Sequence, residues 1–281
     1  MPSTPTASSA LSPPERALSR EARAAESLDA RSAFVFRFFA YWFERSLRAS
    51  FHAARRLGPL PAELSERKLV IYANHPSWWD GVAYVVIARQ LMRGRDVYAP
   101  IDADMLKRYG FMRRMGGFGV DQTSARGAAD FLSVGRAALA RDAPLMIAAQ
   151  GRFADTRERP LRLRPGLAHL ADAEPDLCFL PLALEYSFWN EKRPEMLFGF
   201  GPAIHARELT ALPPRERLAA LEDRLTATLD DLTAAGLTRD PGRFTTFIEG
   251  AGGIDPVYDA GRRLKAAARG KAFSPEHGAR K

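Results

Sequence analysis

The 281-residue chain is 46% hydrophobic and 26% charged, a balance that predicts a globular protein with a sizeable core and excludes a wholly disordered chain. Its single cysteine, Cys178, excludes an intrachain disulfide, argues against a structural zinc site and fits a reducing compartment. The net charge of +8 is concentrated in residues 34–57 and 256–281, around a near-neutral body. That distribution is unlike the basic face of a nucleic-acid-binding module, so we expect no nucleic-acid partner, and it suits an anionic membrane better.

Residues 1–30 are rich in Pro, Ser, Ala and charge and contain no apolar core of a signal peptide, so we expect a disordered arm in which residues 14–30 can form a short helix. Residues 34–57, FVFRFFAYWFERSLRASFHAARRL, follow the period of one amphipathic helix. At about 100° per residue, one side of that helix is polar and consists of Arg37, Glu44, Arg48 and Arg55. Two interpretations are open: the helix packs on its own domain, or it lies in a membrane interface, which the heavy aromatic content favours. No window has ~18 uninterrupted apolar residues, so we expect no membrane-spanning helix.

From residue 68 onward, strand-like and helical patterns alternate. We expect strands at 69–73, 96–101, 118–120, 144–149, 178–186 and 196–201, and helices at 80–93, 125–141, 165–173, 213–236 and 256–269. This alternation predicts an α/β fold, with a mostly parallel central sheet and helices on both faces, preceded by the amphipathic N-terminal helix. The expected divisions are an arm at 1–30, an interface helix at 31–60, a core at 61–210, and a C-terminal helical extension with a basic tail at 211–281.

The string NHPSWWD directly follows the first expected strand. Pro76 disfavours the α conformation at His75, so His75 belongs to an extended turn, and Ser77 is placed to cap a helix beginning near Trp78. Because the chain doubles back in such a turn, the carboxylate of Asp80 can reach the imidazole. An Asp–His pair of this kind fits a general base acting on a substrate hydroxyl. The alternative is a turn histidine and an unrelated acid at a helix start, since an isolated His-x4-Asp pattern is common by chance.

The same string resembles the first motif, N-H-x-[SQ]-x-x-D, of the glycerolipid (1-acylglycerol-3-phosphate type) acyltransferase superfamily, through Asn74, His75, Ser77 and Asp80. Three further blocks agree in order and spacing over about residues 65–205. GGFGVDQ (116–122) resembles G-x-x-F-I-D-R, AAQGRF (148–153) resembles F-P-E-G-T-R, and FLPLALEY resembles a hydrophobic strand that carries a proline. The chain is identified as a divergent member of this superfamily.

The divergence lies in residues that the resemblance assigns to the acceptor's phosphate. Gln122 stands where the second block has Arg, and Ala149, Gln150, Arg152 and Phe153 stand where the third block has Pro, Glu, Thr and Arg, while Gly151 remains. Losing a guanidinium removes a bidentate phosphate contact. We therefore do not expect glycerol phosphate to bind through the usual residues. The arginines of the following loop either contact a substrate phosphate or form a solvated or lipid-facing surface: Arg152, Arg157, Arg159, Arg162 and Arg164.

The resemblance implies a membrane-associated acyltransferase that uses acyl-CoA or acyl carrier protein as co-substrate, with no cofactor, no metal and no covalent intermediate. His75 would deprotonate a lipid hydroxyl and Asp80 would orient His75. The substrate-binding candidates are Asn74, Ser77, Gln122, Gln150, Gly151, Arg152 and Arg157, and backbone donors near Gly151 are candidates for the oxyanion. The expected partners are membrane lipids, held by residues 34–57 and the basic C-terminal tail at the cytoplasmic face, and acyl carrier protein. Two alternatives stay open: a non-catalytic lipid-binding protein of this fold, and a lipid ester or thioester hydrolase.

Overall fold

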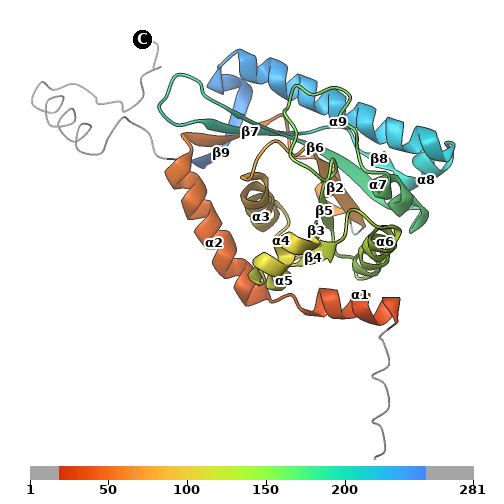
Figure 1. The fold of residues 1–281 in the computed structure, drawn as a ribbon. Helices are drawn as coiled ribbons and strands as arrows, with labels where there is room; N and C mark the ends of the chain where they lie inside the picture. Colours follow the sequence, from red (N-terminus) through yellow and green to blue (C-terminus); the bar gives the residue numbers. More distant parts are fainter. Residues whose placement is uncertain (1–18, 67, 251–281) are drawn as a thin grey trace, which may run out of the picture.

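The computed structural model describes residues 19–66 and 68–250. In this part of the chain the main sheet has seven strands in the order β5–β2–β6–β7–β1–β9, with β8 paired to β6 (Figure 1). Their bounds are β1 Ala53–Leu57, β2 Leu69–Ala73, β5 Leu145–Ala148, β6 Cys178–Ser187, β7 Glu195–Phe200, β8 Ile204–His205 and β9 Phe244–Glu249. β2 is parallel to β5 and β6, and β1 is parallel to β7, whereas the β6–β7, β6–β8 and β1–β9 pairs are antiparallel.

Helices cover both faces of this sheet because successive strand residues point to opposite sides. On β2, Val70 and Tyr72 enter the core formed with α6 (Ala125–Ala140) and α9 (Pro214–Leu237). Leu69, Ile71 and Ala73 enter a second core with α3 (Asp80–Leu91). All five residues of β2 are buried, as expected of a strand covered on both sides. The expected α/β class, with a mostly parallel central sheet between helices, is confirmed.

The remaining elements surround this framework. β3 (Ala99–Asp102) and β4 (Gly117–Val120) form a separate parallel pair. The short helices are α4 Ala103–Arg108, α5 Phe111–Arg114, α7 Gly166–His169 and α8 Ala206–Thr210, with 3-10 turns at Ala62–Ser65, Leu170–Asp172 and Pro241–Arg243. The strands and helices expected from residue 69 to residue 237 therefore occur with small shifts of their ends.

The expectation of one helix over residues 34–57 is wrong at its C-terminal end. Helix α2 runs from Ala33 to Ser50, and Phe51 has an extended backbone. The next residues form β1, which is hydrogen-bonded between β7 and β9. Sheet pairing overrides the helical period here because Arg55, expected on the polar side of a helix, is buried and hydrogen-bonded to Glu195 at 2.9 Å.

The outward side of α2 also differs from the expected polar side. Glu44 faces α3, where its carboxylate accepts hydrogen bonds from Gln90 at 3.0 Å and Arg48 at 2.8 Å. The exposed residues of α2 include four large aromatic side chains: Phe34, Phe38, Tyr41 and Trp42. Solvent therefore meets a mixed aromatic and arginine surface, since Arg37, Arg45 and Arg48 are exposed as well.

The expected core limits of 61 and 210 are too narrow, because the main sheet also includes β1 (residues 53–57) and β9 (residues 244–249).

Within the arm expected at residues 1–30, Arg20–Asp29 form helix α1, which packs on α6 through Ala24 and Leu28, beside it in Figure 1. Residues 1–18, the helix expected at 256–269 and the basic tail lie outside the described residues. Over the described ranges, no helix is both long enough and apolar enough to cross a bilayer.

Candidate active site

The candidate site lies where β2 ends and α3 begins. β2 is flanked by β5 and β6, both parallel to it, so the turn after Ala73 leaves the carboxyl edge of the parallel part of the sheet. Nδ1 of His75 lies 2.6 Å from Oδ2 of Asp80. The structure thus brings these two side chains together across the turn, as the strand–turn–helix argument expects. The edge where parallel strands end is also where open α/β sheets bind ligands.

The Asp80 carboxylate is fully buried and receives three hydrogen bonds. Oδ2 accepts from His75 and from the backbone N–H of Ser77 at 3.0 Å, and Oδ1 accepts from the phenol of Tyr186 at 2.7 Å. A buried charge without such partners would cost several kcal/mol. Burial, together with the Asp80 charge, raises the pKa of Tyr186 well above its usual value. Asp80 is therefore held as a fixed acceptor for the imidazole.

The imidazole of His75 is partly exposed, with 22% of its side chain accessible. Within residues 19–66 and 68–250, only Nδ1 of its two ring nitrogens is hydrogen-bonded to the protein. With Nδ1–H donated to Asp80, Nε2 carries the lone pair and is free to accept a proton. The pair therefore has the arrangement of a general base and the residue that orients it.

Ser77 does not cap the helix as expected. α3 begins at Asp80, and the residue before it, Trp79, makes no side-chain cap. The Ser77 hydroxyl accepts from the Trp79 N–H at 3.2 Å, and its carbonyl accepts from the Asp80 N–H at 3.1 Å. Ser77 thus organises the turn that carries His75, because its backbone also donates to Asp80.

Asn74 and Gln150, both expected to contact substrate, are buried and act as structural clamps. The Asn74 amide donates to the carbonyl of Leu184 at 2.9 Å and accepts from its N–H at 2.8 Å, which ties the turn to β6. Gln150 accepts from the His75 N–H at 2.9 Å and donates to the Leu161 carbonyl at 3.0 Å. A glutamate at 150, as in the family motif, would lack the donor for Leu161. Asn74 and Gln150 therefore fix the backbone of the turn that carries His75.

The second and third motif blocks meet at Gly151, whose φ is +63°. A Cβ there would lie 2.9 Å from Oε1 of Gln122 and 3.0 Å from Nε of Arg164. The guanidinium of Arg164 donates to Gln122 at 3.2 Å. Neighbouring Asp121 is a turn residue: hydrogen bonds from Ser124 and Thr123 lower its pKa to about 2.

The other loop residues divide into neutralised arginines and an aromatic ring. Arg152 pairs with Glu158, and the exposed Arg157 pairs with Asp155 at 2.7 Å, so neighbouring carboxylates compensate both charges. Phe153, where the family motif has Arg, places its ring 4.5 Å from the His75 ring and is 58% exposed. The side of the imidazole that faces this loop is therefore covered by an apolar ring.

Two functional candidates were not predicted from the sequence: Tyr186 and the contact of Phe153 with His75. Tyr186 lies near the end of β6, the strand next to β2, but spacing alone does not reveal that its phenol reaches Asp80. Its ring lies 5.6 Å from the ring of Phe51, which in turn lies 5.0 Å from that of Trp79. Phe51 directly follows α2, so an aromatic chain links α2 to the site.

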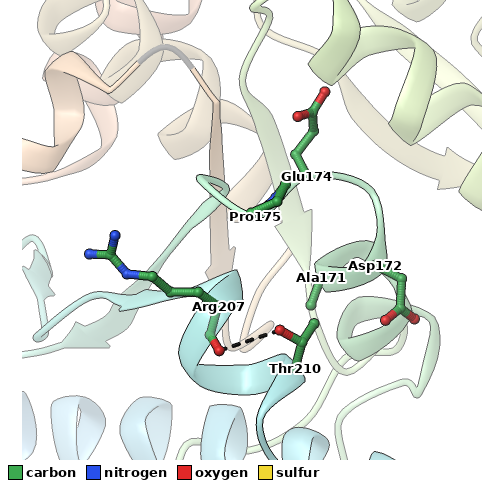
Figure 2. Close-up of a pocket in the computed structure, with 6 residues that line it drawn as sticks. All are labelled: Ala171, Asp172, Glu174, Pro175, Arg207 and Thr210. Carbon is green, nitrogen blue, oxygen red and sulfur yellow. Dashed lines mark hydrogen bonds between the residues drawn. The ribbon is translucent and has the colours of Figure 1, made fainter.

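A surface hollow elsewhere does not compete with this site. Figure 2 shows its lining: Ala171, Asp172, Glu174, Pro175, Arg207 and Thr210. It lies before the start of β6, which pairs with the start of β2, so it is at the sheet edge opposite His75. Its carboxylates already pair with Lys68 and Arg217. Among the described residues, no three His, Cys, Asp or Glu side chains gather as a metal site would require.

Comparison with known proteins identifies the region around His75. Residues 52–185 match the family model described as "Acyltransferase". No curated protein matches the chain. One similar solved structure is the crystal structure of the 1-acyl-sn-glycerophosphate (LPA) acyltransferase PlsC from Thermotoga maritima, with a TM-score of 0.49, 10% identity, and coverage of 76% of this chain and 81% of that chain. The family match spans the strand, the turn and the motif blocks, and it confirms the resemblance that the motifs carry.

Proposed function

We propose that the chain is an O-acyltransferase of the glycerolipid acyltransferase superfamily, and that it moves a fatty acyl group from acyl-CoA or acyl carrier protein to the hydroxyl of a membrane lipid. The observation that carries the proposal is the 2.6 Å contact between His75 and the buried Asp80, with Nε2 of the same ring available. Such a pair activates a hydroxyl without a nucleophilic Ser or Cys.

The proposed reaction is a direct transfer. Nε2 of His75 takes the proton from the acceptor O–H as the oxygen attacks the thioester carbonyl carbon. Asp80 stabilises the imidazolium that forms and keeps its Nδ1 in place. When the tetrahedral intermediate collapses, the C–S bond breaks and the leaving thiolate receives the proton from His75. No bond to the enzyme forms in either step.

The acceptor in this proposal is a lipid alcohol other than lysophosphatidic acid. Phe153 covers the imidazole where a guanidinium would meet a phosphate, and Gln122 is an amide. Arg152 and Arg157 are paired with carboxylates. An apolar wall beside the general base suits an acceptor whose reacting hydroxyl is attached to an uncharged group.

We also propose that α2 holds the enzyme at the cytoplasmic face of a membrane as a peripheral protein. Phe34, Phe38, Tyr41 and Trp42 are 57–71% exposed on one helix. Exposed aromatic side chains with intervening arginines suit the interface of an anionic bilayer. A lipid acceptor in that membrane would then lie next to α2. Phe51, the residue after α2, contacts Trp79 and Tyr186 at the site.

The test is a product assay. Purified protein is incubated with a total lipid extract and labelled acyl-CoA or labelled acyl carrier protein in separate reactions, and products are identified by mass spectrometry. An acylated lipid supports the transfer, and its identity names the acceptor. Release of fatty acid without an acylated lipid would identify a hydrolase, and binding without any product would identify a lipid-binding protein.

His75→Ala is the matching variant. We expect it to lower turnover by at least about 10²–10⁴-fold, the usual contribution of a positioned general base. His169→Ala, which changes an exposed histidine of α7, is the control and should leave turnover unchanged. Turnover of His75→Ala at the wild-type rate would disprove the mechanism.

A further inference from the structure

The carboxylate of Asp80 has a second partner besides the histidine, and this partner carries an inference that rests on the proposed function. We propose that Tyr186 is a positioning residue for acyl transfer: its phenol holds Asp80 from the side opposite His75 and sets how strongly the pair binds a proton. Tyr186 is the last residue of the block FLPLALEY, to which the resemblance assigns no site residue, and the family match ends at residue 185.

Three elements converge on the carboxylate. Asp80 is the first residue of α3, His75 follows β2, and Tyr186 belongs to β6. The Tyr186 phenol donates to Oδ1 at 2.7 Å, while His75 occupies Oδ2 at 2.6 Å. In the described part of the chain, Oδ1 has no other hydrogen-bond donor, and Asp80 is fully buried. Without the phenol, a buried carboxylate oxygen would be left unsatisfied and the carboxylate would be free to rotate.

The phenol acts as a donor only. Burial raises the pKa of Tyr186 far above neutrality, so it keeps its proton over the pH range in which an imidazole titrates. The ring is held in place by Phe51 on one side, with centroids 5.6 Å apart. A fixed donor in a buried site withdraws negative charge from the carboxylate. The carboxylate is then a weaker acceptor for the imidazolium.

This effect predicts the sign of a pH shift. Removing the phenol leaves more negative charge beside the imidazole, and a nearby negative charge raises the pKa of a histidine. His75 acts as a base only when it is unprotonated. The acid limb of kcat/KM should therefore move to higher pH in Tyr186→Phe.

The experiment compares Tyr186→Phe with Tyr84→Phe in the full chain. Both changes remove one phenol oxygen that donates a hydrogen bond, but Tyr84 donates to the Asn74 carbonyl at 3.2 Å and makes no hydrogen bond to Asp80. We expect Tyr186→Phe to lower kcat by about tenfold or more, with a smaller effect on KM, and to raise the midpoint of the acid limb by about half a pH unit or more. Tyr84→Phe should leave that midpoint unchanged. An unchanged midpoint in Tyr186→Phe, or an equal shift in both variants, would overturn the proposal.

Two further measurements keep the test independent of folding and of the assay. Site-specific 3-fluorotyrosine at position 186 keeps the ring packing and donates a stronger hydrogen bond, so it should move the midpoint to lower pH. NMR titration of the His75 imidazole, assigned with His75→Ala, should show a higher pKa in Tyr186→Phe than in the wild type. If NMR shows the shift but no substrate is turned over, the proposed function fails, while the effect of Tyr186 on the His75–Asp80 pair stands. If turnover is found without any shift, the proposed function stands and the role of Tyr186 fails.

Discussion

His75 depends on neighbouring residues that hold its backbone and its ring in place. Gln150 fixes its backbone, Asn74 ties the turn to β6, and Ser77 and Tyr186 satisfy the carboxylate that orients its ring. Gln150 and Asn74 are held in turn by the backbone of Leu161 and Leu184. General-base catalysis needs such a fixed imidazole, because the proton must be taken along one direction as the carbon–oxygen bond forms.

Phe153 lies beside His75, so we expect its side chain to influence which acceptor reacts. Phe153→Arg would replace the apolar ring beside His75 with a cation. We expect the ratio of kcat/KM for a lysolipid phosphomonoester to that for a neutral monoacylglycerol to rise by about tenfold or more, since charge-assisted phosphate contacts are strong. Leu60→Arg, at an exposed position after β1 on the opposite sheet edge, is the control. An unchanged ratio would mean that Phe153 does not face the acceptor.

At the scale of elements, β1 and β7 are joined by a buried charge cluster. Glu195 accepts from Arg55 at 2.9 Å and lies 2.6 Å from Nδ1 of His52, and Arg55 stacks over Trp189. The hydrogen bond to Glu195 raises the pKa of His52 above its usual value. Arg55 and Glu195 are both buried, so each charge depends on the other for its compensation. The cluster sits beside Phe51, the residue that connects α2 to the site.

Glu195→Gln should therefore destabilise the protein in a pH-dependent way. Leaving Arg55 without its buried carboxylate costs about 3–5 kcal/mol. Because His52 has a raised pKa in the folded state, its part of the stabilisation is complete below about pH 6.5 and is lost as the pH rises through the folded pKa. Denaturant unfolding should show a larger loss at pH 6 than at pH 9.

Asp104→Asn, which breaks the exposed pair with Lys107, is the control for Glu195→Gln. Solvent screens an exposed pair of this kind, so this variant should unfold almost as the wild type does. Equal losses for Glu195→Gln at the two pH values would show that His52 contributes nothing to stability.

For the whole molecule, α2 lies along one edge of the body (Figure 1), and its exposed residues include Phe34, Phe38, Tyr41 and Trp42. The helix is attached to α3 through Glu44 and the buried Ala40 and Leu47. Its other side carries aromatic side chains that are more than half exposed. A soluble protein rarely leaves such a surface without a partner.

Replacing Phe34, Phe38 and Trp42 together by Ser tests whether that partner is a bilayer. The buried side of α2 is unchanged, so the fold should persist, while flotation with anionic phospholipid vesicles should fall by about tenfold or more, given the apolar area lost. Leu237→Ser, at an exposed position at the end of α9, should bind vesicles as the wild type does. Unchanged binding of the triple variant would assign the aromatic edge to another partner.

The sequence by itself determined the main strands and long helices from residue 69 to residue 237, the α/β class and the resemblance to acyltransferases. These depend on local periodicity, on the proline after His75 and on motif order, all of which can be read along the chain. The tertiary structure alone decided that residues 53–57 form a strand, that Asn74 and Gln150 are buried clamps, and that Tyr186 and Phe153 join His75. The reason is physical: Arg55 and Glu195 lie 140 residues apart, Asp80 and Tyr186 lie 106 apart, and only strand pairing brings them within hydrogen-bond distance.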